Sequence, residues 1–408
     1  MSVTENENQK DGSLLKEPSF LKVVLLFGLI SMFGDILYEG ARGVLVPYLV
    51  FLNVSVFVVS VSLGFAEFLG FVVRVFSGII TDKWKLYWTF IFLGYGLLIA
   101  LPFIGFTDIW WMIVILYAIE RIGKAIYAPS EDAVFSSIAK GSLGRAFGYR
   151  ELLDQTGAVV GPAILAVILF IQPNDYSLAF FFFFLPYIII MLLVYLSYKK
   201  LGPYSQQKMQ LDIKKHAEEH PDSDGSLPKN FYIYGLSIFF NALGLVYIFA
   251  FIDVITRTAG PGSNWIVSIF YGLIMLVQGL ISPVIGILYD KYGQKVAFIP
   301  FVVAVLPAFA LINPSLTTLL IGCIFFGITL SGQDTIFKAI VGDLVTHKRG
   351  TAFSFYFGFL NTGLLISSAI FGYLLENSMG GDAWIFAVVF EVIAFVLLLV
   401  STSKKYQA

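Results

Sequence analysis

The sequence predicts an all-α integral membrane protein in which twelve transmembrane helices form two pseudo-symmetric six-helix bundles. Hydrophobic residues make up 58% of the 408 residues and charged residues only 13%, whereas a soluble domain has about 25% charged residues. Twelve apolar runs reach the roughly 20 residues that a membrane span needs. A short loop, Gly-Ile-Ile-Thr-Asp-Lys at 78–83, also returns as Gly-Ile-Leu-Tyr-Asp-Lys at 286–291. A signature repeated about half a chain apart indicates a duplicated bundle.

The predicted spans divide six and six around a polar stretch. Several are longer than the membrane is thick, so we expect tilt or extension into the cytoplasm. The organisation is a tail at 1–20, a bundle at 21–198, a linker at 199–230 and a second bundle at 231–403. In order, the spans are 21–50, 56–81, 86–106, 109–138, 144–171, 176–198, 231–256, 264–289, 296–313, 315–344, 351–375 and 383–402.

The distribution of Lys and Arg predicts the orientation. These residues occur before the first span, in the linker, after the last span and in every second connection. The other connections have none, apart from Arg257 at the edge of the seventh span. By the positive-inside rule, both termini and the linker are expected to be cytoplasmic, in a multi-pass protein of the plasma membrane. No cleavable signal peptide is expected, because residues 1–17 are polar and the first apolar run is long.

Several kinds of site are not predicted. A P-loop is absent from the sequence, which argues against a pump driven directly by ATP within this chain. The single cysteine, Cys323, excludes an internal disulfide. His216 and His220 in the linker have the spacing of metal ligands on a helix, but charged runs of this kind usually form solvated surface. We therefore interpret the linker as a charged hinge and predict no metal and no cofactor.

Ionisable residues inside the spans are the main functional signal, because each costs about 2.5–3.5 kcal/mol to insert. Asp35, Glu39 and Arg42 are spaced by four and three residues and share one face of the first span. Arg121 and Lys124 share a face of the fourth span. The fourth span also carries Glu120, Glu131 and Asp132, and other spans carry Glu67 and Arg74, Arg150, Glu151 and Asp154, Asp334 and Lys338, and Glu391. Most of these charges lie in the first half, whereas the second half offers mainly neutral polar groups.

Asp35 and Glu39 are the predicted protonation sites, with Arg121 as the partner that tunes them. Because all three histidines lie outside the spans, proton exchange would have to use carboxylates. Some charges have structural alternatives: Asp334 and Lys338 can form a self-neutralised packing pair. Candidate cavity residues are Tyr38, Arg42, Tyr117, Lys124, Asn241, Gln278, Gln333, Asp334, Lys338 and Asn361. The basic residues in this region would suit an anionic substrate if unpaired, and would mean little if paired.

The repeated loop resembles the signature between the second and third spans of the major facilitator superfamily, which continues with Gly and a basic residue. The second copy keeps the full pattern in Gly286, Asp290, Lys291, Gly293 and Lys295. The first copy keeps Gly78, Asp82 and Lys83 but has Lys85 in place of the glycine, so we expect an altered turn. The resemblance implies that Asp82 and Asp290 cap and bridge neighbouring helices and thereby hold one gating state.

Two further stretches are similar to the proton-coupled efflux branch of that superfamily, the drug:proton antiporters. Arg121 matches an arginine of the fourth span, and Gly148, Gly157 and Gly161-Pro162 follow a pattern of the fifth. Leu165-Ala166 departs from that pattern. Glycines let another helix approach closely and Pro162 permits a bend, although ordinary small-residue packing is an alternative. With these residues, Arg150 and Asp154 complete the expected gating set.

These features predict a secondary transporter rather than an enzyme. The resemblance implies a transporter that works by alternating access and exports a small organic solute in exchange for protons. It would act as a monomer that binds lipid and no nucleic acid. One alternative is uptake by proton symport, and another is uncoupled facilitation of a metabolite or sugar. An alternative of a different class is a non-transporting receptor or assembly protein, but so many costly buried charges argue against it.

Overall fold

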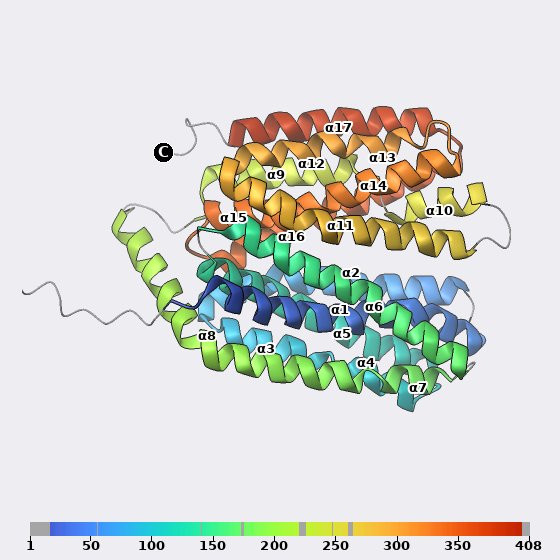
Figure 1. Ribbon diagram of the computed structural model, residues 1–408, viewed down its shortest axis with the longest axis horizontal. Helices are drawn as coiled ribbons and strands as arrows, with labels where there is room; N and C mark the ends of the chain where they lie inside the picture. Colours follow the sequence, from blue (N-terminus) through green and yellow to red (C-terminus); the bar gives the residue numbers. More distant parts are fainter. Residues whose placement is uncertain are drawn as a thin grey trace, which may run out of the picture.

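A computed structural model describes residues 17–54, 56–139, 141–172, 175–219, 226–246, 248–259 and 264–401. Within these residues the regular structure is helical. Figure 1 shows two groups of helices side by side, with α1–α8 in one and α9–α17 in the other. This arrangement confirms the predicted all-α fold and its division into two six-helix bundles.

In the first half, each predicted span corresponds to one helix or to two or three consecutive helical segments. The first five spans begin and end within three residues of their predicted limits. The segments are α1 (Phe20–Phe51), α2 (Val56–Trp84), α3 (Tyr87–Leu97) with α4 (Ala100–Phe103) and η1 (Ile104–Phe106), α5 (Trp110–Ile138), α6 (Leu143–Ile171), and α7 (Tyr176–Phe181) with α8 (Phe184–Glu219).

In the second half, three of the predicted spans are interrupted. The ninth span contains Pro300 and Pro307, which lack the N–H that an unbroken helix requires. The tenth contains a π-helical turn, a distortion often found at functional sites. The segments are α9 (Lys229–Gly244), α10 (Ile248–Ala259), α11 (Asn264–Tyr292), η2 (Gly293–Ala297), α12 (Phe298–Val303), α13 (Val305–Phe309), α14 (Leu316–Gly332), the π turn η3 (Gln333–Phe337), α15 (Lys338–Leu344), α16 (Arg349–Glu376) and α17 (Gly380–Ser401).

Nine stretches of the described residues are long and apolar enough to cross a membrane. One of them, 269–309, covers two consecutive predicted spans. The fourth and seventh predicted spans do not qualify, for two different reasons. Helix α5 carries five charged side chains between residues 120 and 132, and α9 and α10 have only 16 and 12 residues. All twelve spans are therefore present as helices.

The linker differs from the predicted charged hinge over its first part, where residues 199–219 continue α8 as a helix. This extension projects beyond the bundle in Figure 1. Leu201, Ser205, Met209 and Asp212 are all buried, and their spacing places them on one helical face. The ring of His216 stacks on that of His347 with centroids 3.6 Å apart. His220, Asp222 and Asp224 lie outside the described residues, and the described part of the chain holds no cluster of three potential metal ligands.

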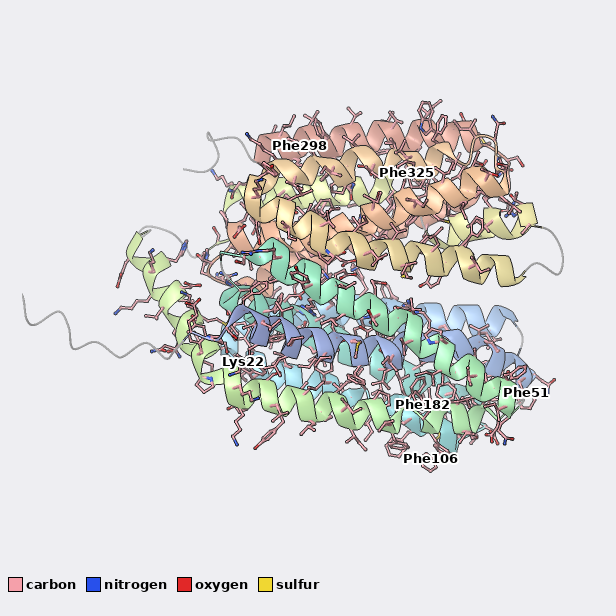
Figure 2. All side chains as sticks on the ribbon, in the orientation of Figure 1. Lys22, Phe51, Phe106, Phe182, Phe298 and Phe325 are labelled. Atoms are coloured by element: carbon pink, nitrogen blue, oxygen red, sulfur yellow. The ribbon has the colours of Figure 1, made fainter. Side chains whose placement is uncertain are left out.

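The two ends of the molecule differ in the loops they carry. Lys22 and Phe298 lie at one end, and Phe51 and Phe106 at the other (Figure 2). The connections after α2, α5, α11 and α15 all lie at the end marked by Lys22 and Phe298. We call it the motif end because it holds both copies of the repeated loop.

The turn after α2 keeps the left-handed residue of its repeat, although the chain continues differently: Gly293 begins the 3-10 helix η2, whereas Lys85 and Leu86 lead directly into α3. Lys85 has φ 56° and Gly293, its equivalent, has φ 67°. The Leu86 N–H donates to the Thr81 carbonyl at 3.2 Å, which is the closing bond of a Schellman helix end. Lys85 therefore adopts the left-handed conformation that glycine adopts without strain.

Replacing Lys85 by glycine should stabilise the protein. Relief of the left-handed conformation, less the extra chain entropy of glycine, is expected to raise the free energy of unfolding by about 0.5–1 kcal/mol. The thermal unfolding midpoint of the purified protein in detergent measures this. Gly293→Lys is the matched control and should lower the midpoint. Equal midpoints for both variants and the parent would contradict the explanation.

Candidate functional site

The two halves touch most closely at the motif end, through pairs of glycines. A Cβ atom at Gly78 would overlap the carbonyl oxygen of Gly350, and one at Gly286 would overlap that of Gly144. Helix α2 thus packs backbone to backbone on α16, and α11 packs likewise on α6. The two contacts are pseudo-symmetric copies of each other, because both glycines of the repeated loop take part.

Next to these glycines, the aspartates of the repeated loop cap helices of the opposite half. Asp82 accepts hydrogen bonds from the backbone N–H groups of Gly350 (3.1 Å) and Thr351, at the start of α16. Asp290 accepts from those of Gly144 (2.9 Å) and Arg145 (3.2 Å), at the start of α6. A carboxylate at a helix N-terminus satisfies N–H groups that have no partner in the helix and is favoured by the helix dipole.

Side chains reinforce the two caps differently. Arg145 Nε donates to Asp290 Oδ2 at 2.7 Å, whereas Asp82 accepts from the hydroxyl of Tyr87. Lys83 and Lys291, which belong to the predicted gating set, are exposed at the motif end. The sequence indicated the two aspartates but not the residues that they cap.

Arg349 forms a further contact between the halves, and sequence reasoning treated it only as a loop cation. It is buried, and its Nη1 donates to Ser136 Oγ of α5 and to the Gly342 carbonyl, both at 3.0 Å. Its Nη2 lies 3.6 Å from Asp212 Oδ2 on the extension of α8. One guanidinium thus joins both halves and the linker helix, and a lone arginine in a loop gave no sequence signal for this.

Deeper in the first half, Glu67 of α2 connects three other side chains. Its Oε1 lies 3.2 Å from Arg42 Nη2 and 3.1 Å from Arg121 Nη1, and accepts from the Tyr117 hydroxyl at 2.8 Å. Arg42 also pairs with Glu39 at 2.9 Å. The Arg42 and Glu67 side chains keep 39% and 47% of their surface exposed, so this network can be reached by solvent.

The predicted protonation site Asp35 lies beside this network but has a different cationic neighbour. Asp35 is 4% exposed, and the positive charge with the strongest electrostatic effect on it is that of Lys124. Lys124 Nζ sits 3.3 Å from the centre of the Tyr38 ring. Arg121 instead makes two hydrogen bonds to Glu120, at 2.6 and 2.8 Å. Lys124 is therefore the cation beside Asp35, whereas Arg121 is held by Glu120.

Three of the four basic residues that bear on an anionic substrate are paired. Arg42 and Arg121 pair as described, and Lys338 lies 2.9 Å from Asp334. Lys124 has no carboxylate oxygen within 4.0 Å among the described residues. Arg74 also lies over a ring rather than a carboxylate, 4.8 Å from the centre of Phe357 on α16. This pairing leaves little free positive charge for an anion.

The gating candidates on α6 have two separate roles. Arg150 pairs with Asp132 at 2.6 Å and Glu131 at 3.3 Å, both on α5, and not with Asp154 on its own helix. Cβ atoms at Gly157 and Gly161 would overlap or crowd the backbone of α1. The close approach that these glycines predicted therefore occurs within the first half, beside Pro162, which lies inside α6.

The second half contains a buried network of amides around Glu391 of α17. Asn241 Nδ2 donates to both carboxylate oxygens of Glu391, at 3.1 and 2.9 Å. Gln333 Nε2 donates to Asn241 Oδ1 at 2.9 Å. Asn361, predicted to line the cavity, donates only to the Phe357 carbonyl of its own helix. The sequence shows no charged partner for Glu391 within its own span, and its hydrogen-bond partner, Asn241, comes from another span.

Gln278 connects this half to the first. Its Nε2 donates to Glu151 Oε1 of α6 at 2.6 Å and to Asp334 Oδ2 of η3 at 3.1 Å. Glu151 was not among the predicted site residues. Together, the caps at the motif end and the polar groups behind them form a boundary that must break for that end to open.

Comparisons with known proteins agree with this architecture. The family model described as Major Facilitator Superfamily matches residues 24–252 and 234–407. An uncharacterized protein of Mycobacterium tuberculosis is 27% identical over 381 residues, 92% of each chain. An uncharacterized MFS-type transporter of Methanocaldococcus jannaschii is 26% identical over 414 residues, 97% of this chain and 98% of its own.

Solved structures share the fold. The proton:xylose symporter XylE superposes with a TM-score of 0.71 at 15% identity, over 95% of this chain and 97% of its own. The E. coli fucose:proton symporter FucP superposes with a TM-score of 0.67 at 13% identity, over 95% and 100%.

Removing either cap should open the motif end. Loss of a capping carboxylate costs about 0.5–2 kcal/mol, so Asp82→Ala or Asp290→Ala should lower the ratio of closed to open molecules about two- to thirty-fold. Maleimide labelling of a Ser354→Cys reporter in a Cys323→Ser background measures opening, because Ser354 is buried between α2 and α16.

Asp175→Ala is the matched control for this experiment. Asp175 caps α7 through the Leu178 N–H at 2.9 Å, within one half and at the opposite end. Its removal should leave the labelling rate of Ser354→Cys unchanged. If all three alanine variants label at the parental rate, the caps do not hold the motif end closed.

Proposed function

The chain belongs to the major facilitator superfamily of transporters, and we propose that it exports a small organic solute in exchange for protons. It would work as a monomer in the plasma membrane, with the motif end on the cytoplasmic side, since the Lys and Arg residues gather there. In this orientation the solute exchanges with the outside while the two aspartate caps keep the cytoplasmic side shut.

The observation that carries the proposal is an excess of carboxylates within the membrane spans. Ion pairs account for Glu39, Glu67, Glu120, Glu131, Asp132 and Asp334. Among the described residues, Asp35, Glu151, Asp154 and Glu391 have no Lys or Arg nitrogen within 4.0 Å. An unpaired buried carboxylate is costly, and taking up a proton removes the charge. A transporter that binds and releases protons needs groups of this kind.

Asp35 is the proposed primary coupling site, with Glu39 as a second carboxylate on the same face. Lys124 stands near Asp35 but rests on the Tyr38 ring. When Asp35 loses its proton, this ammonium can move toward the carboxylate, and when Asp35 regains the proton the Tyr38 ring can hold the ammonium again. Arg121 then serves mainly to hold Glu67 and Glu120, which keeps α2 and α5 together.

The proposed solute site lies on the solvent-accessible side of this region. The half-exposed Arg42 would contact the solute from the first half, and Tyr38 and Tyr117, which are 4% and 3% exposed in this structure, would contact it once the cavity opens. Tyr271 of α11, which experiences the charges of Glu39 and Arg42, would contact it from the second. Aromatic rings next to paired charges favour an amphiphilic solute over a simple anion.

Proton symport is the second candidate. The two solved structures are of proteins described as proton symporters, and they share the fold of this chain. The same carboxylates would serve either direction, because direction depends on which loaded states reorient. The similarity of the span-five glycines to the efflux branch favours export.

An imposed pH gradient distinguishes export in exchange for protons from proton symport. Proteoliposomes loaded with ethidium, D-xylose or benzoate, one probe each, are placed in a more acidic medium. An exporter that exchanges solute for protons should release its probe faster under this gradient, whereas a symporter should release it more slowly. Equal release with and without the gradient, for a probe that the protein does transport, would refute proton coupling.

Asp35→Asn should abolish the gradient-driven component. We expect at least a tenfold loss of release driven by the pH gradient, since an amide cannot exchange a proton, while counterflow of the same probe survives. Asp175→Asn, which alters a cap remote from Asp35, is the control and should retain both activities. Full retention of gradient-driven release in Asp35→Asn would remove Asp35 from the coupling mechanism.

A further inference from the structure

We propose that Glu151, with Gln155, Gln278 and Asp334, forms a second proton-binding site on the boundary between the halves, occupied while the motif end is closed. The inference rests on the proposed proton coupling but concerns different residues from Asp35. Glu151 and Gln155 lie on α6 of the first half, and Gln278 and Asp334 lie on α11 and η3 of the second. Opening of the motif end would therefore divide the site.

A single amide nitrogen bridges two carboxylates in this site. Gln278 Nε2 donates one hydrogen bond to Glu151 Oε1 at 2.6 Å and another to Asp334 Oδ2 at 3.1 Å. The two acidic side chains, one from each half, are thus held within two hydrogen-bond lengths of each other. Two carboxylates this close make ionisation of each other more costly, and Glu151, which is 5% exposed against 32% for the Asp334 side chain, is the one shielded from water.

Only one of the two carboxylates has a cation. Lys338 Nζ lies 2.9 Å from Asp334 Oδ1. Glu151 is 5% exposed and has no Lys or Arg nitrogen within 4.0 Å in the described part of the chain. Lys338 neutralises Asp334, which leaves one negative charge without a partner at the boundary. One proton would balance it.

The hydrogen bonds of Gln155 independently indicate that a donor is lacking at this site. Gln155 is 8% exposed, and its Nε2 donates to Glu151 Oε1 at 2.8 Å. Its carbonyl oxygen Oε1 is buried and has no donor. An ionised Glu151 can only accept hydrogen bonds, whereas a protonated Glu151 also donates one. A proton on the free oxygen of Glu151 would supply the donor that Gln155 Oε1 lacks.

The cations near this site are already paired. Asp154 and Arg150 lie on the same helix, and Arg150 binds Asp132 and Glu131 of α5. On the side of the second half, Lys338 binds Asp334. The Tyr356 hydroxyl of α16 donates to the Gln333 carbonyl at 2.9 Å. Asp154 adds negative charge near Glu151, which strengthens the need for a positive one.

The site lies where α6 and α11 meet, so it responds to opening. Gly144 packs against Gly286, and Gly148 packs against the backbone of Ser282, toward the motif end from Glu151 and Gln278. Separation of these helices would take Glu151 away from Gln278 and admit water. The O–H bond of the Glu151 carboxyl then breaks, its electron pair stays on the carboxylate, and water carries the proton away on the motif side.

The proposal predicts how opening depends on pH. If the closed state holds one proton more than the open state, the ratio of closed to open molecules falls about tenfold for each pH unit above the midpoint. Spin labels on Lys22→Cys and Lys291→Cys, both exposed at the motif end, report this ratio by pulsed electron spin resonance in a Cys323→Ser background. No solute is needed.

Glu151→Gln should remove that dependence. The glutamine amide can donate to Gln155 without a titrating proton, so the closed state should dominate from pH 5 to 9. Gln155→Met is the second variant: it keeps Glu151 but removes both the amide that donates to its carboxylate and the acceptor beside it, and should shift the midpoint from the parental value. The parental pH dependence in both variants would overturn the proposal, as would a closed-to-open ratio that follows Na⁺ concentration instead of pH.

Asp35→Asn separates this inference from the proposed function. Because Asp35 is not part of the boundary site, its replacement should leave the pH dependence of the spin-label distances in place while gradient-driven release is lost. If Glu151→Gln keeps the pH dependence but Asp35→Asn loses coupled release, the boundary site is wrong and the transport proposal stands. If Glu151→Gln removes the pH dependence of the spin-label distances while the parent shows no proton-coupled release, the transport proposal fails instead.

Discussion

The reciprocal capping of helices by Asp82 and Asp290 is the interaction on which the rest of this structure depends. Each carboxylate sits at the end of a helix of one half and binds the free N–H groups at the start of a helix in the other. Opening the motif end exposes both carboxylates and both helix ends to water. Because water can replace these partners, the caps stabilise one state without making the other inaccessible, which is what alternating access requires.

Behind the caps, the two halves manage buried polarity in different ways. The first half uses ion pairs that join α1, α2 and α5 through Glu67, whereas the second half uses the amides of Asn241 and Gln333 around Glu391. Ion pairs hold helices in place but leave little free charge, so titration falls to the carboxylates outside them. We propose that Asp35 within the first half and Glu151 at the boundary respond to different events, solute binding and opening.

Much of the fold could be predicted from local patterns in the sequence. Span limits depend on hydrophobic length, so the predicted limits agree closely with the helices. The repeated loop indicated the two capping aspartates from the sequence. The helical extension of α8 was overlooked because composition alone suggested a solvated hinge. The buried stripe of Leu201, Ser205, Met209 and Asp212 would have revealed it. The left-handed turn at Lys85 had no such signal, since lysine rarely adopts that conformation.

The sequence by itself determined the membrane class, the two bundles, the capping aspartates and the charge asymmetry between halves. The capping role of the aspartates follows from the resemblance to the superfamily, and the rest from apolar length, repetition and the spacing of residues along single helices. Only the tertiary structure decided the partners: Arg121 with Glu120, Arg150 with Asp132, Lys124 with the Tyr38 ring, and Gln278 between Glu151 and Asp334. Helical periodicity specifies which side chains share a face of one helix, but the packing of helices from both halves selects the face they meet.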